Sequence, residues 1–392
     1  MKVLYIFNTS NFRDGSIKSL LTLISGLQER GIVASAVVQR KGEMFTSLSK
    51  KGIHTYVLPL RFNTYPLARN MVDKLLFLPR FVFWQVMNAF SYLSLLNVVR
   101  HEKFDIIHTN VSVINIGFKV AKRLRIPHVF HVREYVDKDF GLHYFPTDRY
   151  LRKTLENSYS ICITKDIQLH HKLNTSRRSS VIYNGIIYQS QIKTNPIKER
   201  YFLYVGRIEP AKGLDVLVKA YHKYVLDTSV TVVPLLVAGE VSDTVFYKNL
   251  LRYIQSNGLS KYISFFGGRD DVFELMRKAL AIIIPSVFEG FGRCMAEAMF
   301  NGCLVIAHDT GGLKEQFDNG KELCGGEIGL RYKTELQLSG HLQDVSKRPY
   351  KFYSDMICRA SSVVGRLYSI EVYVNSVYDV YKRMLGVSEN ND

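Results

Sequence analysis

The residues from 281 to 300 constrain the fold more than any other part of the chain. Ala281 to Ile284 form a short apolar run, typical of a strand that is buried on both faces. A loop with glycines at 290 and 292 follows, and good helix formers occupy Arg293–Phe300. The pattern predicts a parallel strand, a glycine turn and a helix whose free N–H groups attract anions into the turn.

Two carboxylates, Glu289 and Glu297, lie eight positions apart across this turn. Carboxylates beside an electropositive helix start can accept hydrogen bonds from sugar or ribose hydroxyls. Two solvated glutamates are the simpler alternative, but the surrounding frame P-S-x-x-E-G-F-G is specific. It resembles the signature of the family-4 retaining glycosyltransferases of GT-B fold. The resemblance implies that Glu289 contacts the donor sugar, that Gly290, Phe291 and Gly292 meet its hydroxyls and phosphate, and that Glu297 binds the ribose.

Strand, turn and helix alternate along the rest of the chain. Apolar runs that predict strands occupy 3–7, 34–39, 54–58, 106–109, 128–131, 160–164, 181–183, 201–205, 235–238, 263–266 and 304–307. Longer helical stretches separate them, so an α/β fold with doubly wound parallel sheets is predicted. The resemblance implies the GT-B form, two Rossmann-like domains facing across a cleft. We expect an acceptor-side domain at 1–194, a nucleotide-sugar domain at 195–369, and a helix at about 370–388 packing back on the first.

A second anion site is predicted after the run at 201–205. Arg207 and Lys212 lie between Gly206 and Gly213, ahead of an apolar helix. A planar guanidinium and a point-like ammonium can converge on a diphosphate. A chance pair of surface cations is the alternative, but the spacing resembles the diphosphate clamp of the family. Similar glycine turns follow at Gly239 and at Gly268, where relatives read the nucleobase with the backbone.

The first half carries weaker motifs. Gly15 lies in a turn after the strand at 3–7, and this turn either accommodates a phosphate or is a plain turn. Asp14 stands where the family usually has the first of two glycines. His131 ends a predicted strand, where the resemblance implies contact with the donor sugar, and a loop cap is the alternative. Asp137-Lys138-Asp139 is nominally a metal-binding D-x-D. We interpret it as a solvated loop or acceptor contact, and expect no metal and no cofactor besides the nucleotide-sugar.

The segment Phe81–Val99 interrupts the alternation with nineteen uncharged residues. Its length is compatible with a membrane span. Polar residues recur at every third position from Gln85 to Asn97, however, and are predicted to leave no helix face clean for lipid. We expect a packed domain helix, with an interfacial helix or a span as the alternatives.

Composition indicates anionic partners. The chain has 52 Lys and Arg against 35 Asp and Glu, a net charge of +17. Nucleotides, lipid head groups and nucleic acid all fit this charge. Zinc-finger spacing and aromatic RNA-binding signatures are missing, so nucleic acid is not expected. Five scattered cysteines and a short N-terminal apolar run predict a cytoplasmic protein with reduced thiols and no signal peptide. The net charge and the basic residues around Phe81–Val99 predict attachment to the inner face of the plasma membrane, and charges that only keep the fold soluble are the alternative.

The combined interpretation is a glycosyltransferase that moves a sugar from a nucleotide-diphosphate-sugar to a hydroxyl of a glycan or lipid-linked glycan. Retention of configuration, metal independence and a role in cell-envelope polysaccharide synthesis are implied by the resemblance. Two alternatives remain: other GT-B chemistry on sugar phosphates, such as an epimerase or phosphorylase, and a basic nucleic-acid-binding protein. The sequence leaves the sugar, the base and the acceptor open. The resemblance implies that backbone groups read the base, and the acceptor lies against the first domain, where loops vary most.

Overall fold

A computed structural model describes residues 1–12, 14–68, 70–192 and 197–386. The chain forms two compact units: Met1–Gly185 with the segment from Ile370 onward, and Ile186–Ser369. The predicted domain boundary at 194 and 195 lies outside the described residues.

The first unit is built on a seven-stranded parallel sheet with the order β3-β2-β1-β4-β5-β6-β7. Its strands are β1 (Lys2–Ile6), β2 (Val33–Val38), β3 (His54–Val57), β4 (Ile106–Thr109), β5 (His128–Val132), β6 (Tyr159–Cys162) and β7 (Ser179–Val181). All residues of β4 and β5 are buried, as expected for central strands covered on both faces.

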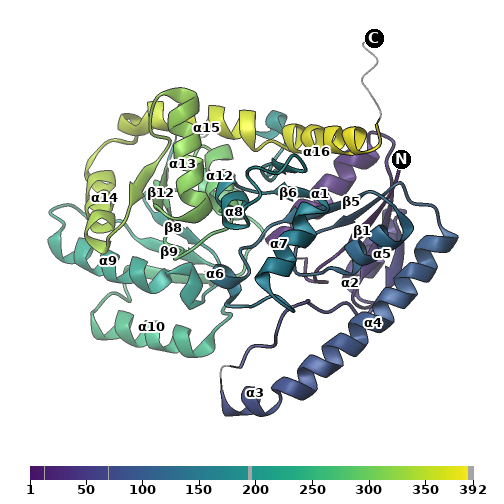
Figure 1. Ribbon diagram of the computed structural model, residues 1–392. Helices are drawn as coiled ribbons and strands as arrows, with labels where there is room; N and C mark the ends of the chain where they lie inside the picture. Colours follow the sequence, from purple (N-terminus) through teal and green to yellow (C-terminus); the bar gives the residue numbers. More distant parts are fainter. Residues whose placement is uncertain (13, 69, 193–196, 387–392) are drawn as a thin grey trace, which may run out of the picture. The chain divides into compact units, whose positions relative to one another are not determined.

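The helices of this unit follow the strands in sequence and cover the sheet (Figure 1). They are α1 (Gly15–Gln28), α2 (Glu43–Lys50), α3 (Met71–Leu75), α4 (Phe77–His101), α5 (Ile116–Leu124), α6 (Asp137–Phe140), α7 (Asp148–Glu156), α8 (Lys165–His170) and α16 (Ile370–Met384). The C-terminal helix α16 packs on α1, and a Cβ atom at Gly26 would lie 2.5 Å from the side chain of Val374. A glycine there lets the two helices approach closely.

Helix α4 differs from the sequence expectation. The polar side chains of Asn88 and Ser91 are buried against the protein, and the backbone N–H of Arg61 donates to Asn88 Oδ1 at 3.1 Å. Between Leu78 and Leu93 the exposed side chains are all apolar. The prediction that polar residues leave no clean apolar face was therefore wrong, because Asn88 and Ser91 are buried against the protein and the apolar residues face outward. By length and composition alone α4 could cross a membrane, with a mean hydropathy of 1.3.

The second unit has a six-stranded parallel sheet with the order β10-β9-β8-β11-β12-β13. Its strands are β8 (Phe202–Val205), β9 (Leu235–Ala238), β10 (Ile263–Gly267), β11 (Ala281–Ile284), β12 (Val305–His308) and β13 (Leu330–Tyr332). Its helices are α9 (Leu214–Asp227), α10 (Thr244–Ser256), α11 (Val272–Lys278), α12 (Arg293–Phe300), α13 (Gly311–Cys324), α14 (Glu335–Lys347) and α15 (Ser354–Leu367), with short 3₁₀ turns at Gln189–Gln191, Pro210–Lys212 and Tyr350–Tyr353. The predicted doubly wound α/β fold is confirmed in both units.

The strand order fixes where each sheet can hold a ligand. In the first unit the order reverses between β1 and β4, and in the second between β8 and β11. Loops leaving two neighbouring strands in opposite directions open a crevice at their carboxyl ends. The motifs at 206–213 and 285–292 follow β8 and β11, so the fold brings them together.

Candidate active site

The candidate donor site lies in the second unit, at the carboxyl ends of β8 and β11. These strands pair directly, with Ala281 opposite Phe202 and Ile282 opposite Leu203. The loop after β8 leads through a 3₁₀ turn into α9, and the loop after β11 leads into α12. Both strands are apolar and buried, so their ends are held rigidly while the polar residues follow in the loops.

A salt bridge joins the two loops. Lys212 Nζ lies 2.5 Å from Glu289 Oε1, and the Ser286 hydroxyl donates to the same oxygen at 2.8 Å. The Lys212 and Glu289 side chains are 25% and 19% exposed, so the pair is mostly shielded yet reachable from solvent. Both described partners bind Oε1, which leaves Oε2 with the capacity to accept from a ligand hydroxyl. The structure thus brings together two of the predicted catalytic residues.

Glycine makes the close approach of these loops possible. Gly213 has φ +66°, and a Cβ atom there would lie 2.0 Å from the Pro285 carbonyl oxygen. The backbone N–H of Val287 donates to the Ala211 carbonyl at 3.1 Å beside this contact. A side chain at position 213 would therefore push the Lys212 loop away from the Glu289 loop.

Helix α13 supports the Glu289 loop from behind. The N–H of Gly312 donates to the Glu289 carbonyl at 2.7 Å, and Gln316 Nε2 donates to the Phe291 carbonyl at 2.6 Å. Gly292, with φ +84°, caps the amino end of α12. The turn is therefore held by one backbone bond and one side-chain bond from α13, and α12 begins directly after it.

The other predicted charged residues have local partners. Arg207 Nη2 lies 3.0 Å from Glu209 Oε1, with the Arg207 side chain 65% exposed. Lys212 pairs with Glu289, and the predicted convergence of Arg207 and Lys212 on a diphosphate stays a prediction. Glu297 lies 3.3 Å from Arg293, one turn earlier on α12. An exposed ion pair such as Arg207 with Glu209 contributes little stability, so the guanidinium is easily redirected.

The predicted backbone contacts lie along the same sheet edge. Gly206, Gly239 and Gly268 follow β8, β9 and β10, and Gly290 lies in the loop after β11. A Cβ atom at Gly239 would lie 1.8 Å from the Gly206 carbonyl oxygen, so the first two turns touch backbone to backbone. Phe291 is buried and packs edge-on against Tyr368. Its side chain therefore anchors the loop, and a ligand would meet the loop backbone.

The first unit has its own polar cluster at the carboxyl ends of β1, β4 and β5. Asp14 caps α1 by accepting from the Ser16 N–H at 2.9 Å, and Gly15 is the first residue of that helix. Asn110 Nδ2 donates to Asn8 Oδ1 at 2.9 Å. Arg133 Nε donates to Asn110 Oδ1 at 3.0 Å. Because the Asp14 carboxylate occupies the helix start, this turn is poorly suited to a second anion.

His131 lies completely buried in the first unit. Its Nδ1 is 3.3 Å from His108 Nε2, and its Nε2 has no partner among the described residues. Burial first, and then the charge of Arg133, lower the pKa of both histidines well below its ordinary value, so both are neutral. The predicted contact of His131 with a donor sugar stays a prediction, since the side chain is covered.

Glu134 and the D-x-D residues have structural partners. Glu134 Oε1 accepts from the N–H and hydroxyl of Ser112 at 2.6 and 2.8 Å, and burial raises the pKa of Glu134 to about 7. Asp139 accepts from the N–H groups of Tyr135 and Val136, at 2.9 and 2.8 Å. Asp137 lies 2.9 Å from His170 Nε2. Within the described ranges, no group of three or more His, Cys, Asp or Glu side chains could hold a metal ion.

Sequence reasoning missed the groups that hold the site in shape. Ser286 lies inside the motif, but its bond to Glu289 depends on the turn bringing the hydroxyl back over three residues. Gln316 carries no motif at all, and its role follows from the packing of α13 under the loop. Arg293 could have been identified, because it is spaced four residues from Glu297 on a predicted helix.

Two family models match consecutive parts of the chain. The model described as "Glycosyl transferase 4-like domain" matches residues 14–164, and the model described as "Glycosyl transferases group 1" matches residues 188–357. Together they cover most of the sequence and both candidate site regions. The chain belongs to the group 1 glycosyltransferase family, which confirms the resemblance.

Relatives and solved structures agree with this assignment. An uncharacterized glycosyltransferase of Methanocaldococcus jannaschii is 29% identical over 225 residues, covering 56% of this chain and 60% of the relative. An Escherichia coli UDP-Gal:alpha-D-GlcNAc-diphosphoundecaprenol alpha-1,3-galactosyltransferase is 25% identical over 264 residues, covering 58% and 65%. The matches therefore span less than two thirds of these relatives.

The structure of Anabaena HepE in complex with UDP and glucose superposes on 98% of this chain and 100% of its own, with a TM-score of 0.74 and 18% identity. Identity at this level establishes the fold. The chain has the GT-B fold.

Proposed function

We propose that this protein is a glycosyltransferase that moves a sugar from a nucleotide-diphosphate-sugar to a hydroxyl of a glycan or lipid-linked glycan, with retention of configuration. The observation that carries the proposal is the contact between Lys212 and Glu289, held between two glycine loops beside the start of α12. Cation, carboxylate and helix start form one small cluster, which suits a substrate that has a diphosphate next to a polyol.

The cations in this cluster act on the leaving group. Cleavage of a sugar–diphosphate bond leaves negative charge on the terminal phosphate, and fixed positive groups stabilise this charge as it develops. Lys212 and the free N–H groups at the start of α12 are the positive groups that flank the Glu289 loop, and Arg207 can leave Glu209 for a stronger phosphate bond. These groups supply the charge stabilisation that a divalent metal supplies elsewhere, so we propose a metal-independent reaction.

The carboxylates orient the donor. Glu289 Oε2 accepts from a sugar hydroxyl while Oε1 keeps its bonds to Lys212 and Ser286. Glu297, steadied by Arg293, accepts from the ribose hydroxyls. Fixing the sugar from one side lets the acceptor hydroxyl meet the anomeric carbon on the face that the phosphate leaves.

The acceptor and location are inferred from the relatives. The E. coli relative is named for a diphosphoundecaprenol-linked sugar acceptor. We infer a similar lipid-linked or glycan acceptor, a role in cell-envelope polysaccharide assembly, and a cytoplasmic location at the inner face of the membrane. No nucleic acid is needed by this chemistry.

A panel of nucleotide-sugars tests the proposal, with thermal stabilisation and release of nucleoside diphosphate as readouts. We expect one nucleotide class to raise the melting temperature, and turnover to require an acceptor. Glu289→Gln should abolish most turnover, and Glu335→Gln, an acidic residue at the start of α14, serves as the matched control. Rapid release of nucleotide without any acceptor would favour hydrolysis or epimerisation and contradict the proposal.

A further inference from the structure

Helix α4 presents a continuous apolar face to solvent. Its exposed side chains include Leu78, Val82, Phe83, Val86, Phe90 and Leu93, of which Leu78, Phe90 and Leu93 are 66%, 57% and 63% exposed. Steps of three and four residues separate most of them, so they lie on one side of the helix. The opposite side packs on α5. Figure 1 shows α4 as a long helix at the edge of its unit, with α3 at its amino end.

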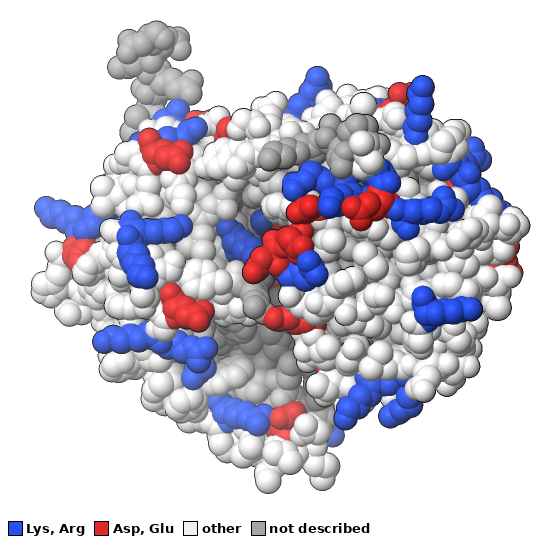
Figure 2. Space-filling view, turned by 180° about the vertical axis from the view of Figure 1, so that it is seen from behind, with Lys and Arg blue, Asp and Glu red and all other residues white. Residues whose placement is uncertain are grey.

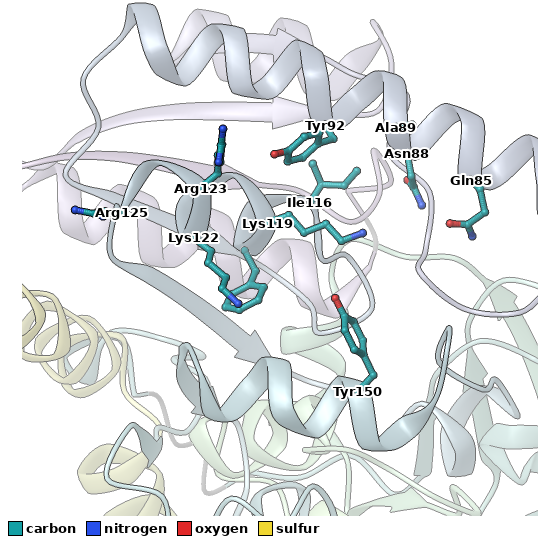
Figure 3. A pocket seen from close by; sticks show the side chains of 11 residues that line it. Gln85, Asn88, Ala89, Tyr92, Ile116, Lys119, Lys122, Arg123, Arg125 and Tyr150 are labelled. Atoms are coloured by element: carbon teal, nitrogen blue, oxygen red, sulfur yellow. The ribbon is translucent and has the colours of Figure 1, made fainter.

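A basic pocket lies directly beside this apolar face. It has a volume of about 810 Å³ and is bordered by α4, α5 and α7. Four cations line it, Lys119, Lys122, Arg123 and Arg125, and no Asp or Glu is among its described lining residues. In Figure 3, Lys119 from α5 and Tyr150 from α7 point into the space beneath Gln85 and Asn88 of α4. The pocket therefore offers ammonium, phenol and amide donors without a protein anion to satisfy them.

A second basic pocket continues the first. It shares Lys122 and Arg125, has a volume of about 600 Å³, and adds Arg177, Arg178 and Arg383, again without an acidic residue in its described lining. Figure 2 shows Lys and Arg spread over the visible face with Asp and Glu between them. The described linings of the two pockets, in contrast, contain cations and no acidic residue.

This combination restricts what can cover α4. A second copy of the chain would bring its own charge of +17 toward the same basic pockets, and this repulsion opposes self-association. A neutral apolar partner would leave the four cations without counter-charge. The surface of an anionic bilayer satisfies both features, because it offers an acyl boundary and phosphate groups side by side.

We propose that α4 and the pocket between α4, α5 and α7 form a binding surface for an anionic lipid bilayer. The apolar face of α4 enters the head-group and acyl boundary, and a lipid phosphate occupies the pocket beside Lys119 and Lys122. Neighbouring groups desolvate the Lys119 ammonium and lower its pKa, so an anion in the pocket would be bound by a cation poorly hydrated by water. The proposal gives a physical basis to the membrane location inferred above and requires neither donor nor acceptor.

Vesicle co-sedimentation of the full chain tests the proposal without substrates. Phosphatidylcholine vesicles with and without phosphatidylglycerol are compared at low and high salt. We expect binding that requires phosphatidylglycerol and weakens as salt rises. Removing two cations with Lys119→Gln and Lys122→Gln should weaken it about 30-fold. The paired controls Lys219→Gln and Lys248→Gln remove two exposed cations from α9 and α10 of the other unit.

The apolar face is tested in the same assay. Phe90→Ser with Leu93→Ser should weaken binding at least about tenfold, since both side chains would leave the acyl boundary. Leu226→Ser with Leu336→Ser removes two apolar side chains of similar exposure, 72% and 63%, from the other unit, and should have no effect. Circular dichroism confirms folding of each variant.

Three results would overturn the proposal. Wild-type binding by both the Lys119/Lys122 variant and the Phe90/Leu93 variant would assign attachment to another surface. Salt-resistant binding to neutral vesicles would indicate insertion of α4 as a span. Absence of vesicle binding together with a dimer that Phe90→Ser dissociates would identify a second copy of the chain as the occupant. Absence of vesicle binding together with stabilisation by inorganic phosphate alone would identify a free anion. Glycosyl transfer to a soluble acceptor is assayed separately, and none of these three results would contradict that activity.

Discussion

Replacing Lys212 by alanine tests the donor site at its centre. Lys212 is the cation whose ammonium contacts Glu289 at 2.5 Å, and its loop is pressed against Pro285 through Gly213. In the absence of donor the change removes one partner of a partly buried ion pair. Ser286 still donates to Glu289, so the cost in folding free energy should stay at about 1 kcal/mol.

The larger effect is expected on catalysis. A hydrogen bond to a charged group contributes about 1.5–3 kcal/mol, and here the negative charge develops on the leaving phosphate. Loss of that bond in the transition state lowers kcat/KM by about 10- to 150-fold. If Lys212 only held Glu289 in place, then Lys212→Ala would cost nothing further in the Glu289→Gln background. We expect a substantial further loss, because we propose that the two side chains contact different parts of the donor.

Release of nucleoside diphosphate in the presence of acceptor is measured for wild type, Lys212→Ala, Glu289→Gln and the double variant. Lys219→Ala, an exposed lysine on α9 close in sequence, is the matched control and should behave as wild type. Wild-type kcat/KM in Lys212→Ala would refute the assignment of this site. If Lys212→Ala caused no further loss of kcat/KM in the Glu289→Gln background, Lys212 would only position the Glu289 carboxylate.

Three further predictions concern the pH response, the loop contact and the metal. Burial raises the pKa of Glu134 from 4.5 to about 7, so between these values the unfolded chain releases a proton that the folded chain keeps, and stability falls as pH rises. In urea titrations, the free energy of unfolding of Glu134→Gln should therefore rise by on the order of 3 kcal/mol relative to that of wild type between about pH 5 and about pH 8. A difference between the two that stays constant with pH would contradict this. Gly213→Ala should destabilise the fold more than Gly258→Ala, since both have φ +66° but only Gly213 faces a backbone oxygen, and equal melting temperatures would argue against the contact. Turnover should survive excess EDTA, whereas a loss that manganese restores would show that a metal takes part.

The fold was predictable because buried parallel strands appear in the sequence as short apolar runs. Ala281 to Ile284, for example, could hardly be anything but a central strand once a glycine turn and helix followed. Helix α4 was predicted as a packed helix, and its exposed face was missed. A polar residue such as Asn88 is typical of a surface in sequence, but its side chain is buried here and accepts from the backbone N–H of Arg61. Which side of a helix faces the protein depends on such tertiary partners.

The candidate site was predictable where the glycine motifs fix the backbone. The sequence predicted Lys212 and Glu289 in separate glycine motifs, and their contact follows from the pairing of β8 and β11, which the sequence alone does not give. The partners of Arg207 and the burial of His131 could not be predicted either, since both depend on side-chain packing. Gln316 supports the loop from a helix that follows one strand later, so no local pattern identifies it.

The most direct test of the proposed activity is mass spectrometry of the acceptor after incubation with a nucleotide-sugar. A polyprenyl-diphosphate-linked glycan is the substrate, and proton NMR of the product reports the anomeric configuration. The account predicts that wild type adds one sugar residue with the configuration of the donor, and that Glu289→Gln adds far less under the same conditions. An unmodified acceptor across the whole donor panel, or equal transfer by Glu289→Gln, would contradict it.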